Sequence, residues 1–306
     1  MKFNNLIHIF TLIIFLFVIQ NEKLFSEDIT TDTLPILKYD LTEQQINSYK
    51  LYGLLGATIG TFAITQIYQY EDYWGKRNDF TVMDWKTEYD DALCADKFGH
   101  FYFTYGLTKL YTNGFQWTGM DEKSSTFYSS IIALSYQTYV EIQDGFSTGQ
   151  PYLGFSRGDI IANFAGAIYP NLQVRYDYLK NYNMKISFNK SKNYDKIGYQ
   201  NVTMDYESTY HWLSIDIYNQ LSDESKKYWT PYINLAIGHS VKNIDRYGVG
   251  NHEVYLSLDW NLEPLREYYD KDNHLLNSIL TFIGLYKLPA PAVKIYPNVV
   301  WYGLRL

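Results

Sequence analysis

The residues best suited to chemistry in this sequence fall into three short polar clusters. The first lies in ADKFGHFYFTYG, residues 95–106, where Asp96 and His100 are four positions apart and Lys97 stands between them. On a helix, a spacing of four places two side chains on the same face. An imidazole beside a carboxylate can hold a metal ion or exchange a proton near neutral pH. This cluster is therefore the first candidate for a functional site.

The other two clusters have the same character. In YVEIQDGFS, Glu141 and Asp144 are three positions apart, and in GFSRGDIIANFAG, Asp159 and Asn163 are four apart. Each spacing again puts both side chains on one helical face. The segment between these clusters is rich in glycine, so the chain can turn tightly there. We therefore expect the three clusters to meet at one end of a group of packed helices.

A histidine among several carboxylates can have three kinds of role. It can bind a divalent metal ion, although no HExxH-type spacing selects the metal. It can perform acid and base chemistry, since crowded carboxylates shift one another's pKa toward neutrality. It can also be a hydrogen-bonded polar cluster that fixes the register of the helices. The candidate catalytic residues are His100, Glu141 and Asp159; the candidate metal ligands are Asp96, His100, Glu141, Asp144 and Asp159; Lys97 and Asn163 complete the polar site.

Two serines match the text of a nucleophile motif. GFSTG surrounds Ser147 and GFSRG surrounds Ser156, and both fit Gly-x-Ser-x-Gly. A nucleophile elbow needs a buried strand before the serine and a helix after it, whereas a helix end and a loop are predicted here. We interpret both serines as cap or turn residues. The histidines of the second half, which are His211, His239 and His252, are scattered and are interpreted as ordinary core or surface residues.

Composition excludes several classes of protein. The 306 residues carry a net charge of −7 without blocks of like charge, so no nucleic-acid partner is expected, because nothing would neutralise a phosphate backbone. Cys94 is the single cysteine, which excludes an intrachain disulfide and a cysteine-built metal site. Tyrosine is unusually frequent, with 32 copies beside 17 Phe and 7 Trp. Such side chains gather in aromatic cores, at wet binding surfaces and at membrane interfaces.

The first 26 residues have the layout of a secretory signal peptide. Lys2 precedes an apolar block, Leu6 to Ile19, and a short polar stretch follows it. A retained N-terminal anchor is the alternative. No cysteine follows the apolar block, so a lipid-bearing cysteine is not expected at this terminus. Residues 27–40 form a polar lead-in.

Four helices are predicted over residues 41–175. The first begins near Leu41, where Thr42 and Gln45 resemble a capping box. Its segment Leu51 to Tyr68 has no charged residue and carries glycines that would let two helices approach closely, so it is either buried or embedded in a membrane. The others are expected at 96–113, 124–143 and 156–172, from the recurrence of apolar residues every three or four positions. Together they predict a four-helix bundle.

The period changes to two in residues 176–306. Alternating segments near 183–189, 210–218, 231–240 and 253–262 predict antiparallel strands, and VVWYGLRL at the end predicts another. One more helix is expected from about Asn273 to Leu285, ended by the prolines of KLPAPAVKIYP. The predicted fold class is α+β: an N-terminal four-helix bundle followed by a small antiparallel sheet with one additional helix.

The order of DKFGHFYFTYG, YVEIQDGFS and GFSRGDIIANFAGA resembles a YfiM-like family of predicted periplasmic lipoproteins, a domain of unknown function. The segments YHWLSIDI, YINLAIGHS, VYLSLDWNL and KLPAPAVKI resemble the second half of its longer envelope form. A shorter similarity to VanZ-like membrane proteins covers Asp96, Lys97, His100, Glu141, Asp159, Asn163 and Gly166. Both resemblances imply packed helices with a shared polar centre, and neither brings an established reaction with it.

These observations predict an exported, membrane-associated envelope protein in the periplasm or at the outer membrane, with membrane lipid or another envelope protein as its partner. Two functional classes stay open. One is a non-enzymatic protein whose polar site is structural or binds an ion or ligand. The other is an envelope enzyme, a metal-assisted or acid/base hydrolase acting on a lipid or cell-wall component. A divalent metal ion is the one cofactor that the residues suggest.

Overall fold

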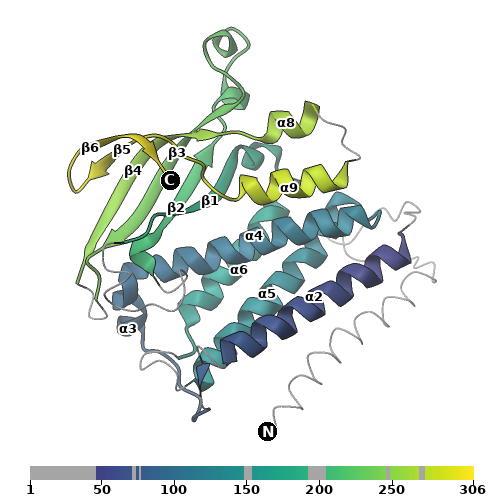
Figure 1. Cartoon of the computed structure of the whole chain (residues 1–306), viewed down its shortest axis with the longest axis vertical. Coiled ribbons are helices and arrows are strands. Elements are labelled where there is room, and N and C mark those ends of the chain that lie inside the picture. The colour runs from purple at the N-terminus through teal and green to yellow at the C-terminus, as the bar shows by residue number, and fades with distance from the viewer. Residues whose placement is uncertain are drawn as a thin grey trace, which may run out of the picture. The chain divides into compact units, whose positions relative to one another are not determined.

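Three long helices carry the polar clusters. They are α4 (Ala95–Trp117), α5 (Glu122–Phe146) and α6 (Arg157–Arg175), and in the computed structural model they pack against one another (Figure 1). The helix α5 runs opposite to the other two, so its C-terminal end lies beside the N-terminal ends of α4 and α6. The predicted helices are confirmed, with ends that differ by a few residues.

The structure describes residues 46–70, 74–75, 77–147, 154–191, 205–245, 249–268 and 273–306, all within the unit Gln44–Leu306. The predicted signal peptide at 1–26, the lead-in at 27–40 and the cap at Thr42 lie outside the described residues.

Small residues allow the three helices to approach closely. A Cβ atom at Gly166 of α6 would lie 2.3 Å from the carbonyl oxygen of Phe101 in α4. On the other side, the Ser130 hydroxyl of α5 donates to the carbonyl oxygen of Ala167 at 2.8 Å. Because these contacts involve backbone atoms, the spacing between the helices is fixed at the level where the polar clusters lie.

The helix α2 (Ser48–Gln69) lies along α5. Asn47 caps it by accepting a hydrogen bond from the amide of Lys50 at 3.0 Å. Phe62 stacks on Tyr136 of α5 with ring centroids 4.2 Å apart, and the Tyr139 hydroxyl donates to Gln66. With α4, α5 and α6 this makes the four predicted helices; their arrangement as one four-helix bundle stays a prediction.

The glycines of α2 do not have the predicted contacts within the described part of the chain. A Cβ atom at Gly53, Gly56 or Gly60 would meet nothing within 4 Å. Apolar residues such as Tyr52 and Ile64 are also exposed on this helix, so the expectation of a buried helix holds only for the side that faces α5. Among the described helices, none has both the length and the apolar character needed to cross a bilayer.

Six strands form one antiparallel sheet in which neighbours in sequence are neighbours in space. They are β1 (Tyr182–Phe188), β2 (Thr209–Ile215), β3 (Ile233–Lys242), β4 (Asn251–Trp260), β5 (Ala290–Tyr296) and β6 (Val300–Arg305). The structure also contains two short helices, α3 (Trp85–Asp90) and α8 (Glu263–Tyr268), and the longer helix α9 (His274–Gly284). The α+β class is therefore confirmed.

The strand β5 was not predicted, because its segment APAVKIY contains a proline. In the sheet, Pro291 lies between Ala290 and Ala292, where the pairing with β6 shifts its register. A register irregularity accommodates a residue that has no amide hydrogen. The short helices α3 and α8 were also missed, since six residues are too few to show a helical period.

The sheet has an unusual distribution of polarity. One face buries charged and aromatic residues together: Lys185 pairs with Asp259 at 2.6 Å, and the Lys287 ammonium lies 4.6 Å from the Trp212 ring centre. The other face exposes apolar side chains on β3 to β6. These residues are Leu235, Ile237, Leu256, Trp260, Ile295, Trp301 and Leu304. We call them the apolar sheet face.

The helices meet the sheet at β1 and β2. Ile186 of β1 is buried in a cluster with Tyr102 and Tyr105 of α4 and with Leu285. The Tyr102 hydroxyl donates to the carbonyl oxygen of Leu285 at 2.8 Å. The sheet therefore fixes the position of α4, the helix on which most of the candidate site depends.

The replacement Gly166→Ala should lower the free energy of unfolding by about 1–3 kcal/mol, because the new methyl group forces α6 away from α4. Gly99→Ala is the matched control, since a Cβ atom at that α4 position meets nothing within 4 Å. It should leave stability unchanged or raise it by up to about 1 kcal/mol. Urea denaturation measures both variants, and equal effects would contradict the close crossing at Gly166.

Candidate functional site

A strained turn sets the start of α4 and with it the direction of Asp96. Ala92, Leu93 and Cys94 all have positive φ angles, of 46°, 52° and 62°. Left-handed backbone costs about 1–2 kcal/mol per non-glycine residue, so surrounding contacts must hold it. Ala92 is buried in a cluster with Ala95 and Val241, which supplies such contacts. The helix then begins at Ala95, with Asp96 in its first turn.

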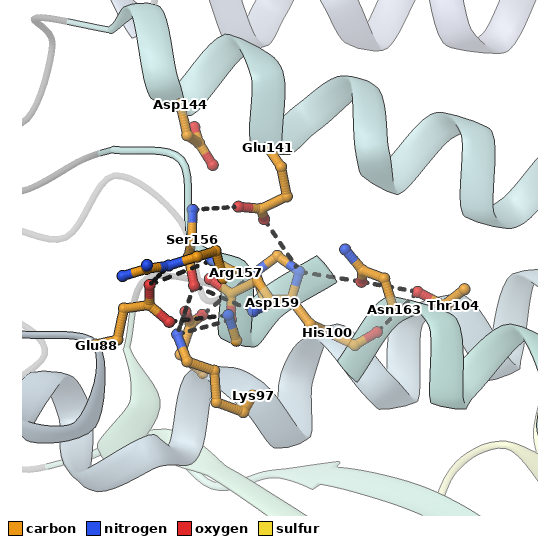
Figure 2. A network of polar contacts seen from close by, with 12 residues as sticks. Glu88, Lys97, His100, Thr104, Glu141, Asp144, Ser156, Arg157, Asp159 and Asn163 are labelled. Carbon is orange, nitrogen blue, oxygen red and sulfur yellow. Dashed lines mark hydrogen bonds and ion pairs between the residues drawn. The ribbon is translucent and has the colours of Figure 1, made fainter. Parts of the chain in front are cut away.

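His100 lies at the centre of the three clusters (Figure 2). Its Nδ1 atom is 3.2 Å from Asn163 Oδ1 and 3.4 Å from Glu141 Oε1. Its Nε2 atom is 3.6 Å from Asp96 Oδ1 and 3.8 Å from Asp159 Oδ2. One imidazole thus touches side chains from all three helices. The structure brings together the residues that the spacing rules placed on separate helical faces.

The two ring nitrogens of His100 differ in what they can do. Asn163 Oδ1 is a hydrogen-bond acceptor, so Nδ1 carries a proton and donates to it. Nε2 also faces two carboxylate oxygens. A bare lone pair would be repelled there, so Nε2 must carry a second proton or face a bound cation. This choice decides what the site does.

Lys97 occupies the remaining oxygens of the same two carboxylates. Its Nζ atom is 2.7 Å from Asp159 Oδ1 and 3.4 Å from Asp96 Oδ2, and it donates to Ser156 Oγ at 3.3 Å. Burial lowers the pKa of this ammonium, but Asp96 and Asp159 outweigh burial and raise it above its usual range. Lys97 therefore stays charged and balances part of the negative charge of the cluster.

The carboxylates respond to burial in different ways. Burial raises the pKa of Asp96, yet His100, Lys97 and a hydrogen bond from Tyr206 together hold that pKa below its usual value. Burial, followed by the neighbouring Asp96, raises the pKa of Asp159 to about 6. Asp96 is thus the carboxylate most strongly held in its charged form.

The acidic residues of α5 are more deeply buried. Glu141 is 1% exposed and accepts a hydrogen bond from the amide of Ser156 at 3.3 Å. Burial, then Asp159 and Asp144, raise the pKa of Glu141 far above its usual value. Asp144 accepts from the indole of Trp74, and burial raises its pKa to about 7 against that hydrogen bond. Asp144 therefore belongs to the edge of the cluster and contacts Trp74 directly.

Glu88 is a member of the site that sequence reasoning missed. Its carboxylate accepts from the amides of Arg157 at 3.2 Å and Gly158 at 2.8 Å, at the N-terminal end of α6. A carboxylate at this position satisfies free amides and interacts favourably with the helix dipole. Tyr206, whose hydroxyl donates to Asp96 Oδ1 at 2.7 Å, was also missed. Both lie on separate elements, so no local spacing could have identified them.

The two motif serines serve as caps, as predicted. Ser156 accepts a hydrogen bond from the amide of Asp159 at 3.1 Å and begins α6, and it is fully buried. Ser147 ends α5 and donates to the carbonyl oxygen of Trp74 at 2.7 Å. Ser147 follows the helix α5, and no strand precedes Ser156 within the described residues 154–156, so neither serine shows the context of a nucleophile elbow.

One group of ligand atoms has the geometry of a metal site. Within the described part of the chain, Asp96, His100 and Asp159 each offer one atom, and these three atoms lie within 4.8 Å of one another. One imidazole and two carboxylates suit first-row divalent cations. Glu141 and Asp144, which were also candidate ligands, are not part of this group. Thr104 donates to Asn163 Oδ1 at 3.0 Å and so holds the residue that orients His100.

Residues 83–175 match a protein family described as "Predicted periplasmic lipoprotein (DUF2279)". This region runs from just before α3 to the end of α6 and contains every residue of the candidate site named above except Tyr206 and Trp74. The match does not extend to the sheet, and the family's description states no role. Comparison of the chain with curated proteins and with solved structures gave no match.

Asp144→Asn should flatten the pH dependence of stability. The folded-state pKa of about 7 lies above the ordinary aspartate value of 3.8, so the wild-type protein loses stability as pH rises from about 4 through 7. The variant stays neutral and can still accept from Trp74. It should match the wild type near pH 4 and exceed it by up to about 4 kcal/mol at pH 8.

Urea denaturation across this pH range measures the difference. Asp223→Asn, at a fully exposed aspartate, is the control and should show no such trend. A constant offset between Asp144→Asn and the wild type at every pH would contradict a raised pKa at Asp144.

Proposed function

We propose that this is an exported envelope protein that binds a divalent cation between α4 and α6, with Asp96, His100 and Asp159 as ligands. The observation that carries the proposal is the convergence of one atom from each residue within 4.8 Å. Ligands bound at about 2.1 Å to one ion lie about 3–4 Å from one another. The distances of 3.6 Å and 3.8 Å from Nε2 to the two carboxylates fall in this range.

The surroundings of His100 support the proposal. Metal-binding histidines usually donate their second ring N–H to a carboxylate or carbonyl group, which fixes the ring and its tautomer. Asn163 Oδ1 provides such an acceptor at Nδ1. The lone pair of Nε2 is then directed at the space between Asp96 and Asp159.

The charge of the cluster also supports a cation. Four carboxylates, Asp96, Glu141, Asp144 and Asp159, lie around one lysine and one histidine, and the pKa values of three of them are raised. Burial is the largest cause of each shift, and the neighbouring carboxylates add mutual repulsion. A bound divalent ion would relieve it without displacing Lys97, because Lys97 uses the other oxygens of Asp96 and Asp159.

We favour a binding role over hydrolysis because the candidate ligands are largely covered. The side chains of His100, Asp96 and Asp159 are 16%, 19% and 6% exposed. A catalytic metal needs an open position for substrate. The two serines nearest to the cluster in sequence are occupied as caps. The site is better suited to holding an ion than to admitting a lipid or cell-wall polymer.

Membrane association is the second part of the proposal. The apolar sheet face exposes seven large apolar side chains. Soluble proteins rarely leave such patches uncovered, and tryptophan is enriched at membrane interfaces. The signal-like N-terminal sequence and the description of the matched family both support an envelope location. We propose that this face contacts membrane lipid.

Metal content tests the first part. Purified protein loaded with Zn²⁺ or Mn²⁺ and then desalted should retain about one ion per chain by elemental analysis. His100→Ala should retain at least tenfold less, because it removes the nitrogen ligand. His274→Ala, a histidine at the start of α9, is the control and should bind as the wild type does. Absence of metal from both the wild type and His100→Ala would end the proposal.

The replacement Lys97→Met should change the affinity for the cation in the opposite direction. It removes the ammonium that neutralises Asp96 and Asp159, so the cation should bind more tightly, by about tenfold or more. Calorimetric titration of Zn²⁺ measures the change. Weaker binding in this variant would show that Lys97 helps to hold the ligands, and it would count against an independent metal position.

Vesicle flotation tests membrane contact. Trp301→Ser combined with Leu304→Ser should reduce the fraction of protein that floats with phospholipid vesicles several-fold, because both side chains are strongly exposed. Tyr228→Ser, at another strongly exposed aromatic residue outside the apolar sheet face, is the control. Equal flotation of all three proteins would contradict the proposal that the apolar sheet face contacts membrane lipid.

A further inference from the structure

A small polar cavity lies at the other end of α4. Its volume is about 40 Å³, and it is bounded by α4, by the strands β1 to β3 and by the helices α8 and α9. Lys109 is the charged residue of α4 that lines this cavity. Lys109 is thirteen positions after Asp96, which is about 20 Å along a helix. This cavity is therefore separate from the metal site.

The positively charged side chains around the cavity differ in their hydrogen-bond and ion-pair partners. Lys185 binds Asp259 at 2.6 Å and the carbonyl oxygen of Trp260 at 2.8 Å. Arg266 binds both carboxylate oxygens of Glu263 at 3.1 Å. Lys109 has neither a hydrogen bond nor an ion pair with any residue that the structure describes. Glu263 lines the same cavity and acts on Lys109 only through space, without a direct ion pair. An enclosed ammonium that makes no direct ion pair is costly, so a negative ligand would be stabilised beside it.

Two buried neutral groups at the cavity also lack partners. Asn234 is 4% exposed and Thr281 is 7% exposed, and neither Asn234 Oδ1 nor Thr281 Oγ1 has a hydrogen bond among the described residues. Buried polar atoms are nearly always bonded, so each of these atoms needs a water or a ligand atom. Both residues line the cavity.

The orientation of the Asn234 amide follows from its neighbours. Ser214 donates its single hydroxyl proton to Asp259 at 2.6 Å, so it must accept from Asn234 Nδ2 at 3.1 Å. Asn234 Oδ1 is therefore a true acceptor at the cavity. A ligand that satisfies the site needs an anionic oxygen for Lys109 and a hydrogen-bond donor for Asn234.

The cavity has a wide approach. A second hollow of about 570 Å³ is lined by Asn113, Gln116, His274 and Asn277 among others, and it shares Glu263 and Arg266 with the small cavity. The Glu263–Arg266 pair therefore stands where the two spaces adjoin. The larger volume is typical of a site for a small organic molecule, and the smaller one accommodates only a head group.

We propose that this second site binds a small organic carboxylate that carries a hydroxyl group next to the carboxylate. The carboxylate occupies the 40 Å³ cavity beside Lys109, and the hydroxyl donates to Asn234 Oδ1. Any further polar part of the molecule lies in the larger hollow past Arg266. No covalent step is involved.

Binding of glycolate and acetate to the full chain tests the site, with EDTA present so that the metal site plays no part. Ligand-detected NMR titration should show saturable binding of glycolate, several-fold tighter than that of acetate, which lacks the hydroxyl. Lys109→Met should weaken both ligands at least tenfold. Lys123→Met, an exposed lysine of α5, should bind as the wild type does.

A second variant separates the two contacts. Asn234→Leu should remove the preference for glycolate while acetate still binds, and circular dichroism checks that each variant is folded. If neither ligand saturates the wild-type protein, or if Lys109→Met binds both as tightly as Lys123→Met, the cavity holds water only and the proposal is wrong. Loss of metal binding at His100 would not change these outcomes, so the two proposals fail separately.

Discussion

The structure depends on one requirement: the charges buried between α4, α5 and α6 must be balanced. His100 and Lys97 come from one helix and meet carboxylates from the other two. Removing a buried charge from its partner typically costs about 3–5 kcal/mol, so these contacts tie the helices into one arrangement. The N-terminal end of α6, its cap Ser156 and the neighbouring α3 all lie beside this cluster. Glu88, for example, satisfies the amides of α6 directly beside it.

Close helix packing and a polar interior are linked in this protein. Gly166 lets α6 approach α4 until backbone atoms touch, and this brings Asn163 within 3.2 Å of His100. Burial, more than the neighbouring carboxylates, raises the pKa values of Glu141 and Asp144, so the same close packing favours the uncharged form of both groups. The cation proposed for this site would stabilise the folded arrangement when bound.

The helix α4 contributes residues to two proposed sites, one for a cation and one for an anion. Its N-terminal end contributes Asp96 and His100 to an acidic cluster suited to a cation, and Lys109 near its other end faces a cavity suited to an anion. Between them, Tyr102 and Tyr105 anchor the helix to β1 and to Leu285. The sheet in turn buries its charged face and exposes an apolar one, which is the reverse of what a sheet facing water on one side usually does.

Spacing within single helices was readable from the sequence by itself. The pairs Asp96 with His100 and Asp159 with Asn163, the capping role of Ser156 and the alternation in four strands all follow from local periods of 3.6 and 2 residues. Only the tertiary structure decided which faces meet, because contacts with Glu88, Tyr206 and the partners of Lys97 join segments far apart in the chain. It also decided that β5 tolerates Pro291 and that Lys109 makes no direct ion pair with any described residue. These outcomes depend on the register between strands and on where three elements enclose a space, and neither is encoded in the spacing of neighbouring residues.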